Sequence, residues 1–345
     1  MDPSKAPAWI IGEGGLIGSQ VRRVMGQGGH RLRPWDCPER PFAWKDPGRL
    51  LGQLAASVAA FEAEIRARGG PWAVFWCAGV GIVGANPGVL DGERVAFGQL
   101  LDLLGRGLAA PGTGVPGLVF FASSGGGVYG NCPDRPITER SAPVPISPYG
   151  HHKLALEGRF AEWAEGRPAV ATLVARISNL YGAGQNPEKP QGLISYMSRN
   201  IIFQKPLNIY MPLDTIRDYH FAGDCAGDLV ACVDRLLPGG DGSGPAARVT
   251  KIFASEQAAS IAQILGVFVS LTRYRPRFVR HSGPAASLQP RSLQFRSDVL
   301  REVGPARRTG LFNGVNQVHR QNLADYMSGR LRPPVPRPAS PRVTP

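Results

Sequence analysis

A tyrosine and a lysine stand four residues apart in the stretch SPYGHHK at residues 147–153. The serine can cap a helix and the proline can begin it, so Tyr149 and Lys153 are predicted to lie one turn apart on the same helix face. A lysine ammonium beside a phenol favours the tyrosinate, which can exchange a proton with a sugar or alcohol hydroxyl near neutral pH. Tyr149 is therefore the candidate acid/base, although this spacing also occurs by chance in many proteins.

A second candidate site is the glycine-rich stretch GEGGLIG at residues 12–18. It follows a short apolar run ending at Ile11, which suits a buried strand, and a helical pattern starts near Leu16. Glycines let the backbone turn tightly and approach a pyrophosphate, whose charge then lies against the helix N-terminus. A glycine turn between a strand and a helix predicts a dinucleotide-binding site, whereas the glycines alone would be a weak signal.

The residue expected to hold the adenosine ribose is Asp36, which follows the glycine turn by about 20 positions. A carboxylate there hydrogen-bonds the ribose hydroxyls and disfavours a 2′-phosphate. Arg31, Arg33 and Arg40 surround Asp36 in the sequence, and an arginine can instead receive the additional phosphate of NADP. The sequence thus favours NAD and leaves NADP open, and it leaves open that Asp36 is only a solvated loop acid.

A third candidate site lies in FASSGGGVYG at residues 121–130, where an apolar run passes into three glycines. In an open parallel sheet, ligands bind beyond the carboxyl ends of the strands. Ser123 and Ser124 are therefore expected to face the same crevice as the first glycine turn. The alternative interpretation is a turn that is merely rich in small residues.

The elements that position these motifs follow from an alternation of apolar runs and helix-length segments. Runs typical of buried strands recur at 72–77, 118–122 and 170–177, separated by segments such as 49–68 and 90–108. Strands alternating with helices predict an α/β fold with a Rossmann-type doubly wound parallel sheet. After Tyr181 the rhythm loosens, which predicts a smaller C-terminal α/β substrate lobe.

The composition excludes several classes of protein. The 345 residues carry 39 Lys+Arg against 26 Asp+Glu, but the basic residues are spread along the chain rather than gathered in one stripe, so no nucleic-acid partner is expected. No apolar run is long enough to span a membrane, and no N-terminal leader is apparent. Five cysteines without a C-x-x-C pair suggest neither a disulfide framework nor a metal site, and we expect a cytoplasmic protein.

The three motifs, in this order, resemble the extended short-chain dehydrogenase/reductases, in particular the NAD-dependent epimerase/dehydratase group that acts on nucleotide sugars. The resemblance covers about residues 8–330 and is strongest in IGEGGLIGSQ, SSGGGVYG, ISPYGHHKLALE and RISNLYGAGQN with its follow-on TIRDYHFAGDCAGDLV. It implies a Rossmann domain at 1–180, to which 213–255 returns. It further implies a nucleotide-sugar-binding lobe at 181–212 and 256–330, and we expect a disordered tail at 331–345.

The resemblance also implies roles for individual residues. Tyr149 is the implied acid/base, with Lys153 and Ser124 as further catalytic residues. The residues implied to bind the cofactor are Gly12, Gly15, Leu16, Ile17, Gly18, Asp36, Cys77, Ala78, Gly79, Ser123, Tyr149, Lys153 and Ile177. Those implied to bind the nucleotide-diphosphate sugar are Ser124, Asn179, Leu193, Tyr210 and Arg217. No metal is expected.

The sequence departs from the family pattern at three places. The position four residues before the tyrosine of the VYG turn, usually Ser or Thr, is Gly125, and Ser124 is the nearest substitute. Gly126 and Gly127 stand where dehydratases of the family carry acidic residues, so acid-assisted elimination is disfavoured. The usual Gly-Asp-Gly turn before RDY is replaced by residues 211–213, Met-Pro-Leu, which leaves the shape of the nucleotide pocket open.

The resulting hypothesis is an NAD-dependent nucleotide-sugar epimerase that acts at C4 through a transient 4-keto intermediate. Tyr149 removes the C4 hydroxyl proton while hydride passes to NAD⁺, and the ketone then receives the hydride on its other face. Two alternatives stay open: an NAD(P)H-dependent sugar reductase or dehydrogenase of the same fold, and a cofactor-binding protein without catalytic activity. Relatives pair two helices from each subunit, so the expected assembly is a homodimer.

Overall fold

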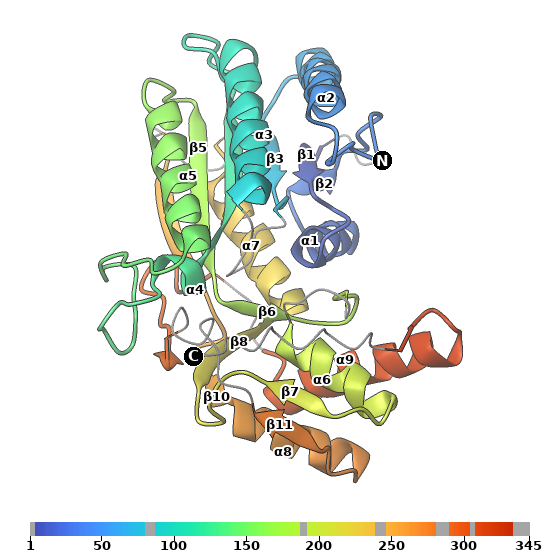
Figure 1. Ribbon diagram of the computed structural model, residues 1–345. Coiled ribbons are helices and arrows are strands. Elements are labelled where there is room, and N and C mark those ends of the chain that lie inside the picture. Colours follow the sequence, from blue (N-terminus) through green and yellow to red (C-terminus); the bar gives the residue numbers. More distant parts are fainter. Residues whose placement is uncertain are drawn as a thin grey trace.

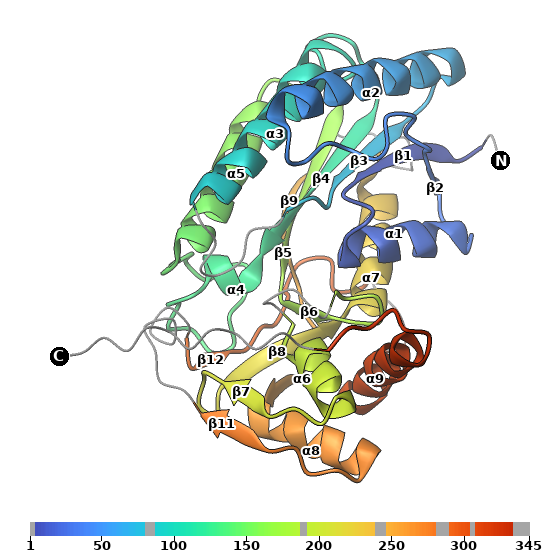
Figure 2. The same cartoon turned by 45° about the vertical axis from the view of Figure 1, so that its right-hand side comes forward.

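The computed structural model of the protein describes residues 4–79, 87–186, 192–238, 246–280, 290–303 and 308–333. The chain forms two lobes, a large one built on a parallel sheet and a smaller one that lies below it in Figures 1 and 2. The predicted tail at 331–345 lies outside the described residues from position 334 onward.

Six strands form the sheet of the large lobe in the order β2-β1-β3-β4-β5-β9, and all neighbouring strands are parallel. Their bounds are Ala6–Ile11 (β1), Leu32–Pro34 (β2), Trp72–Trp76 (β3), Gly117–Ser124 (β4), Val170–Ile177 (β5) and Arg248–Phe253 (β9). From β1 the chain adds β2 on one side and every later strand on the other. The predicted Rossmann-type, doubly wound α/β fold is therefore confirmed.

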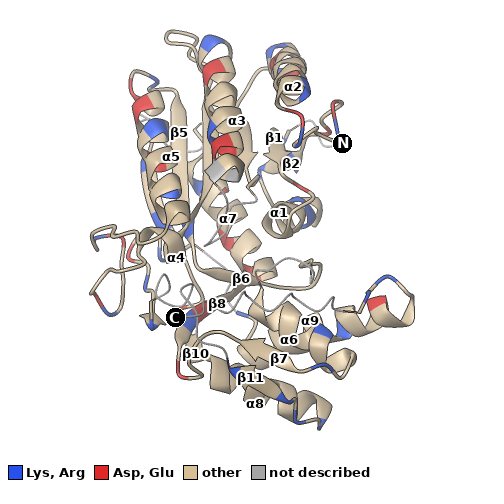
Figure 3. Ribbon diagram, viewed as in Figure 1, with Lys and Arg blue, Asp and Glu red and all other residues tan. Residues whose placement is uncertain are grey.

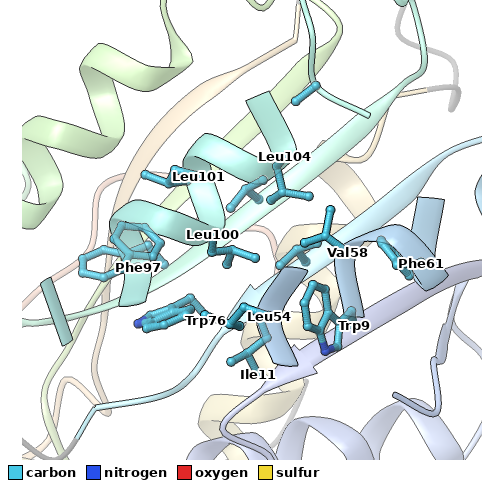
Figure 4. Packing of buried hydrophobic residues seen from close by; sticks show 14 of the residues in the cluster. Trp9, Ile11, Leu54, Val58, Phe61, Trp76, Phe97, Leu100, Leu101 and Leu104 are labelled. Carbon is cyan, nitrogen blue, oxygen red and sulfur yellow. The ribbon is translucent and has the colours of Figure 1, made fainter. Parts of the chain in front are cut away.

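Helices cover both faces of this sheet, with α2, α3 and α5 on one face and α1 and α7 on the other (Figure 1). Their bounds are Leu16–Gly26 (α1), Pro47–Arg68 (α2), Pro87–Arg106 (α3), Pro148–Ala164 (α5) and Ala222–Leu236 (α7). Because successive strand side chains point to opposite faces, strands β1, β3, β4 and β5 contribute residues to the hydrophobic cores on both sides of the sheet. Trp9 and Ile11 pack with α2 and α3 (Figure 4), whereas Ala8 and Ile10 pack with α1 and α7.

The smaller lobe combines helices with short strands around a third hydrophobic core. Its helices are Leu193–Ile202 (α6), Ile261–Thr272 (α8) and Leu311–Met327 (α9). Its strands are Asn179–Tyr181 (β6), Leu207–Ile209 (β7), Ile216–Phe221 (β8), Ala258–Ser260 (β10), Phe278–Arg280 (β11) and Ser292–Leu293 (β12). β8 pairs with β6, β10 and β12, and β7 pairs with β11. Between β8 and β10 the chain returns to the large lobe, where it forms α7 and β9.

The charged side chains are distributed rather than clustered. Figure 3 shows Lys and Arg on helices and loops of both lobes, interspersed with Asp and Glu. Within the part of the chain that the structure describes, no helix is long and apolar enough to cross a membrane.

A buried ionic network ties α5 to the sheet beneath it. Glu157 on α5 accepts hydrogen bonds from the Arg176 guanidinium on β5, with Nη2 to Oε2 at 2.7 Å, and both side chains are at most 10% exposed. The Ser123 hydroxyl donates to Glu157 Oε1 at 2.5 Å, and Arg176 Nη1 donates to the Tyr129 hydroxyl at 2.5 Å. Two charges removed from water in this way must stay paired, because an unpaired buried carboxylate is costly.

Replacing Arg176 by methionine should lower the free energy of unfolding by about 3–5 kcal/mol, because the Glu157 carboxylate is left buried without its cation. Urea unfolding at neutral pH measures the change. The double variant Arg176→Met/Glu157→Gln should recover much of it. Arg330→Met, which removes an exposed pair with Asp325, should cost no more than about 1 kcal/mol. Equal losses in Arg176→Met and Arg330→Met would contradict this account of the network.

Candidate active site

The turns after β1 and β3 lie side by side at the point where the strand order reverses, which is where open α/β sheets bind ligands. The Cys77 N–H donates to the Ile11 carbonyl at 2.8 Å, which joins the two turns. Gly12 has a φ of +91°, and a Cβ at this residue would lie 2.5 Å from the Ala78 nitrogen. Only glycine fits there without displacing the neighbouring turn.

The glycine turn leads directly into α1. The Gly15 N–H donates to the Gly12 carbonyl at 2.9 Å, and Gly15 is the N-cap of the helix that Leu16 and Ile17 begin. A Cβ at Gly18 would overlap the Gly12 carbonyl oxygen, so this glycine allows the first turn of the helix to pack on the loop. The helix N-terminus thus presents free backbone N–H groups beside the sheet edge, as an anion site requires.

Asp36 lies beside two arginines, in the segment that leads from β2 to α2. Its Oδ1 accepts from Arg22 Nη2 at 2.5 Å and from Arg40 Nη2 at 3.4 Å, and its side chain is 54% exposed. Both arginines also pair with Glu13 in the glycine turn. Asp36 is therefore held next to the turn, with two guanidinium groups in the same place.

The other two arginines that the sequence placed near Asp36 are engaged elsewhere. Arg31 donates to the carbonyl oxygen of Asp234 at 2.9 Å, and Arg33 pairs with Glu64. Arg22 takes their place, and the sequence reasoning missed it. Its position on the exposed side of α1 was visible in the helical pattern, but its direction toward Asp36 depends on how β2 packs against α1.

Tyr149 and Ser124 approach each other around Gly127. A Cβ at Gly127 would lie 3.2 Å from the Tyr149 ring and 3.3 Å from Ser124 Oγ. Ser124 ends β4 and caps the short helix α4 (Gly125–Val128), since its Oγ accepts from the Gly127 N–H at 3.1 Å. Tyr149 follows Ser147, whose Oγ caps α5 by accepting from the Gly150 N–H at 3.1 Å. The Tyr149 ring and the Ser124 hydroxyl therefore both lie next to Gly127.

Lys153 lies one turn further along the same face of α5. Its Nζ is 6.0 Å from the centre of the Tyr149 ring, and it donates to Glu93 Oε1 at 2.6 Å and to the Ala122 carbonyl at 3.1 Å. The side chains of Lys153 and Glu93 are 5% and 4% exposed. Burial disfavours the charged ammonium, but the facing Glu93 carboxylate and Tyr149 raise the pKa of Lys153 above its ordinary value.

Glu93 on α3 is a site residue that the sequence reasoning missed. Burial alone would raise the pKa of its carboxyl, but Lys153 and His152 hold that pKa below the ordinary value. The His152 Nε2 lies 3.4 Å from Glu93 Oε2, whereas His151 is exposed. A signal was available, because Glu93 falls on the same helical face as the buried Leu90 and Phe97. A carboxylate on an apolar face needs a buried partner.

Two of the predicted cofactor residues have side chains directed into the protein. The Ser123 hydroxyl belongs to the Glu157 network described above, and Ile177 packs in the core beneath α1 and α7. Cys77 and Ala78 lie in the turn after β3, and burial raises the pKa of the Cys77 thiol to about 12. Gly79 ends this turn against the Glu93 carboxylate, where a Cβ would lie 3.1 Å from Oε1.

The predicted substrate residues lie toward the smaller lobe. Asn179 begins β6, and its Oδ1 lies 3.6 Å from the position of a Cβ at Gly126. Arg217 on β8 is 7% exposed and donates to the carbonyls of Ile216 at 2.8 Å and Pro290 at 2.5 Å. Burial lowers the pKa of its guanidinium. Leu193 begins α6 and Tyr210 follows β7, where it is 40% exposed.

Gly125, which stands where the family usually carries Ser or Thr, lies next to Phe295. A Cβ there would lie 3.2 Å from Phe295 Cζ and 3.3 Å from the Arg176 carbonyl oxygen. Phe295 and Leu293 come from the segment that contains β12, so the smaller lobe packs on the turn after β4. Among the described residues no cluster of His, Cys, Asp and Glu side chains is placed to hold a metal ion.

Comparison with curated proteins finds similarity over about a third of each relative's length. A putative UDP-glucose 4-epimerase of Methanocaldococcus jannaschii is 33% identical over 109 residues, covering 31% of this chain and 35% of that protein. A dTDP-4-dehydro-6-deoxyglucose reductase of Escherichia coli is 37% identical over 109 residues, covering 31% of this chain and 33% of that protein. The named relatives thus differ in the reactions they carry out.

Solved structures match the fold over nearly the whole chain. UDP-glucose 4-epimerase of Thermus thermophilus in complex with NAD superposes with a TM-score of 0.70 at 18% identity, covering 91% of this chain and 98% of that one. RMD of Pseudomonas aeruginosa complexed with NADPH gives a TM-score of 0.72 at 18% identity, covering 92% and 98%.

The family itself is identified over most of the large lobe and the start of the smaller one. The sequence matches the NAD dependent epimerase/dehydratase family over residues 8–241, a span that contains the glycine turn, the Ser124 turn and the Tyr149 helix. These are the elements that the structure brings to one edge of the parallel sheet. The chain belongs to the NAD-dependent epimerase/dehydratase family.

Proposed function

We propose that the protein is an NAD-dependent epimerase that inverts C4 of a nucleotide-diphosphate sugar, with Tyr149 as acid/base. The observation that carries this proposal is the meeting of Tyr149 and Ser124 at Gly127, with the Lys153 ammonium one helical turn away. A phenol, a hydroxyl and a cation in this arrangement suit proton transfer at a sugar hydroxyl.

The residues in the turns after β1 and β3 fit a dinucleotide. Gly12 has a positive φ and lies so close to Ala78 that no Cβ fits between the two turns, and the N-terminus of α1 follows directly after the glycine turn. Its backbone N–H groups would hold the pyrophosphate, Asp36 the adenosine ribose and Lys153 the nicotinamide ribose. The nicotinamide, when bound, supplies the hydride acceptor and donor.

The chain's own residues would then handle the proton and orient the sugar. Tyr149 takes the proton of the C4 hydroxyl as the 4-keto sugar forms and returns it when the ketone is reduced on its other face. The Ser124 hydroxyl, whose oxygen already accepts from the Gly127 N–H, keeps its own proton to donate to the sugar oxygen. Lys153 stabilises the phenolate by its charge.

Arg217 would bind the nucleotide diphosphate. Its guanidinium is buried and held by two backbone carbonyls, and among the described residues no carboxylate lies within ion-pair distance of it. A buried guanidinium without an acidic partner suits a phosphate, whose oxygens it can bind in pairs. Asn179, facing Gly126 across the catalytic turn, would contact the same ligand.

The glycines at 126 and 127 favour epimerisation over dehydration. Elimination of water from a 4-keto sugar needs an acid beside the leaving hydroxyl, and Gly126 near Asn179 and Gly127 near Tyr149 carry no side chain. A net reduction of a keto sugar is the second candidate. Arg22 and Arg40 beside Asp36 support it, since they could accept the phosphate of NADPH.

We also propose a homodimer in the cytoplasm. The pairing of helices expected for the family supports the dimer. The cysteine side chains are all free thiols, as is usual in a reducing compartment. Sedimentation equilibrium tests the assembly directly, and a monomer at micromolar concentration would contradict it.

Tyr149→Phe should reduce turnover by about a thousandfold, because it removes only the phenolic hydroxyl, the proposed acid/base group. Purified protein is incubated with UDP-hexoses, without added cofactor, and the C4 pairs are separated by chromatography. Tyr326→Phe, on the exposed end of α9, should retain full activity. No interconversion of any C4 pair by the unmodified protein would count against the epimerase, and stoichiometric consumption of NADPH would favour the reductase.

Gly12→Ala should weaken NAD⁺ binding about tenfold or more, which corresponds to 1.4 kcal/mol, because its Cβ must displace the Ala78 turn. Calorimetric titration with NAD⁺ measures the change. Gly14→Ala is the matched control, since a Cβ there meets nothing within 4 Å and binding should stay unchanged. Equal affinities of the two variants would argue against a dinucleotide at this turn.

Asp36→Ala should raise the Kd of NAD⁺ about tenfold, because a charged hydrogen bond to the ribose is lost. The same change should leave NADP⁺ binding unchanged or stronger, since it frees Arg22 and Arg40 for a phosphate. Parallel titrations with both cofactors decide between them. Tighter binding of NADP⁺ than of NAD⁺ by the unmodified protein would overturn the preference for NAD.

A further inference from the structure

We propose that Glu93 is a positioning residue that fixes the Lys153 ammonium beside Tyr149 and offsets part of its charge. The inference rests on the proposed acid/base role of Tyr149. It assigns a part in the chemistry to α3, a helix that carries none of the residues expected from the sequence motifs.

The geometry of the pair is that of a fixed contact rather than a mobile surface bridge. Glu93 Oε1 and Lys153 Nζ are 2.6 Å apart, and each side chain is at most 5% exposed. Gly79 closes one side of the carboxylate, where even a Cβ would lie only 3.1 Å from Oε1. The ring of Phe121 lies under the ammonium, with its centre 5.0 Å from Nζ. Both partners are thus confined to one arrangement.

The hydrogen bonds of Lys153 leave one direction for a ligand. An ammonium has three N–H donors, and Lys153 uses one on Glu93 and one on the Ala122 carbonyl. In the described part of the chain the third N–H has no acceptor. Because two acceptors from α3 and β4 fix the nitrogen, the remaining donor points in a set direction, and a ligand hydroxyl that it binds is oriented with it.

The charges around the pair determine its effect on Tyr149. The titratable groups that face Lys153 are Glu93 from α3 and Tyr149 and Glu157 from its own helix, and His152 faces Glu93. Glu93 stabilises the ammonium and also opposes the field that Lys153 exerts on the phenol. Without the Glu93 charge, loss of a proton from the Lys153 ammonium and from the phenol should both become more favourable. The pH dependence of the reaction should therefore move to lower pH.

The first measurement needs no substrate or cofactor. The chain contains only six lysines, so NMR of ¹⁵N-lysine-labelled protein can follow each side-chain nitrogen, with the Lys153 signal assigned by Lys153→Met. In the unmodified protein the pKa of Lys153 should lie above that of an ordinary lysine, because the Glu93 carboxylate stabilises the ammonium. In Glu93→Gln it should titrate at least about one pH unit lower, the effect of losing an opposite charge in contact.

Three variants make the outcome decisive. Asp91→Asn removes the same charge from an exposed position on α3 and should leave the Lys153 titration unchanged. Glu93→Asp keeps the charge and should keep the titration near that of the unmodified protein. If Glu93→Gln does not fold, Glu93→Ala, which leaves room for water beside Lys153, should shift the titration in the same direction. An unchanged titration in the folded neutral variant would overturn the proposal.

The second measurement is the pH dependence of kcat/KM for the sugar interconversion. Both limbs of the profile should move to lower pH by about one unit in Glu93→Gln and stay in place in Asp91→Asn. A loss of activity that is equal at every pH would indicate a purely structural residue and contradict the proposal. If the protein converted no sugar, only the proposed function would be contradicted, because the NMR titration would still test the role of Glu93.

Discussion

The orientation of α5 on the sheet depends on two ion pairs at its buried face. Tyr149, Lys153 and Glu157 follow one another at intervals of four residues, so they line a single stripe of the helix that faces β4. Lys153 is balanced by Glu93 of α3, and Glu157 by Arg176 of β5. Because each charge would be costly without its partner, the rotation of α5 about its axis is fixed, and the position of the phenol follows from it.

Close backbone packing sets the second constraint on the site. At the turn after β1, the chain passes so near the turn after β3 that a side chain at Gly12 is excluded. At the turn after β4, Gly127 lets the Tyr149 ring and the Ser124 hydroxyl lie close to the backbone, since a Cβ there would be 3.2 Å from the ring and 3.3 Å from Oγ. The same residue type therefore permits a close approach at both turns: of backbone to backbone after β1, and of side chains to backbone after β4.

Much of the large lobe could be predicted from the sequence, because its signals are local. Mainly apolar runs predicted β3, β4 and β5, and the Ser147-Pro148 pair predicted the start of α5. The glycine turn and the Tyr149–Lys153 spacing likewise lie within single elements. The family assignment follows from the same local motifs, whereas the roles of individual site residues stay predictions.

What the sequence did not reveal depends on contacts between distant segments. Glu93 meets Lys153 across 60 positions, and Arg22 meets Asp36 only because β2 packs beside α1. Of the arginines near Asp36 in sequence, Arg31 and Arg33 turn toward α7 and α2. The short strands of the smaller lobe pair with partners far along the chain, and two or three residues give no periodic pattern to read.

Phe295 has a consequence for how such a site can evolve. Its ring occupies the space next to Gly125, so the glycine is not an empty place waiting for a hydroxyl. A mutation that added a serine there would first meet an aromatic neighbour contributed by the other lobe. The residues at 125 and 295 are therefore coupled by packing, because a side chain added at position 125 fits only if the ring at position 295 moves or becomes smaller.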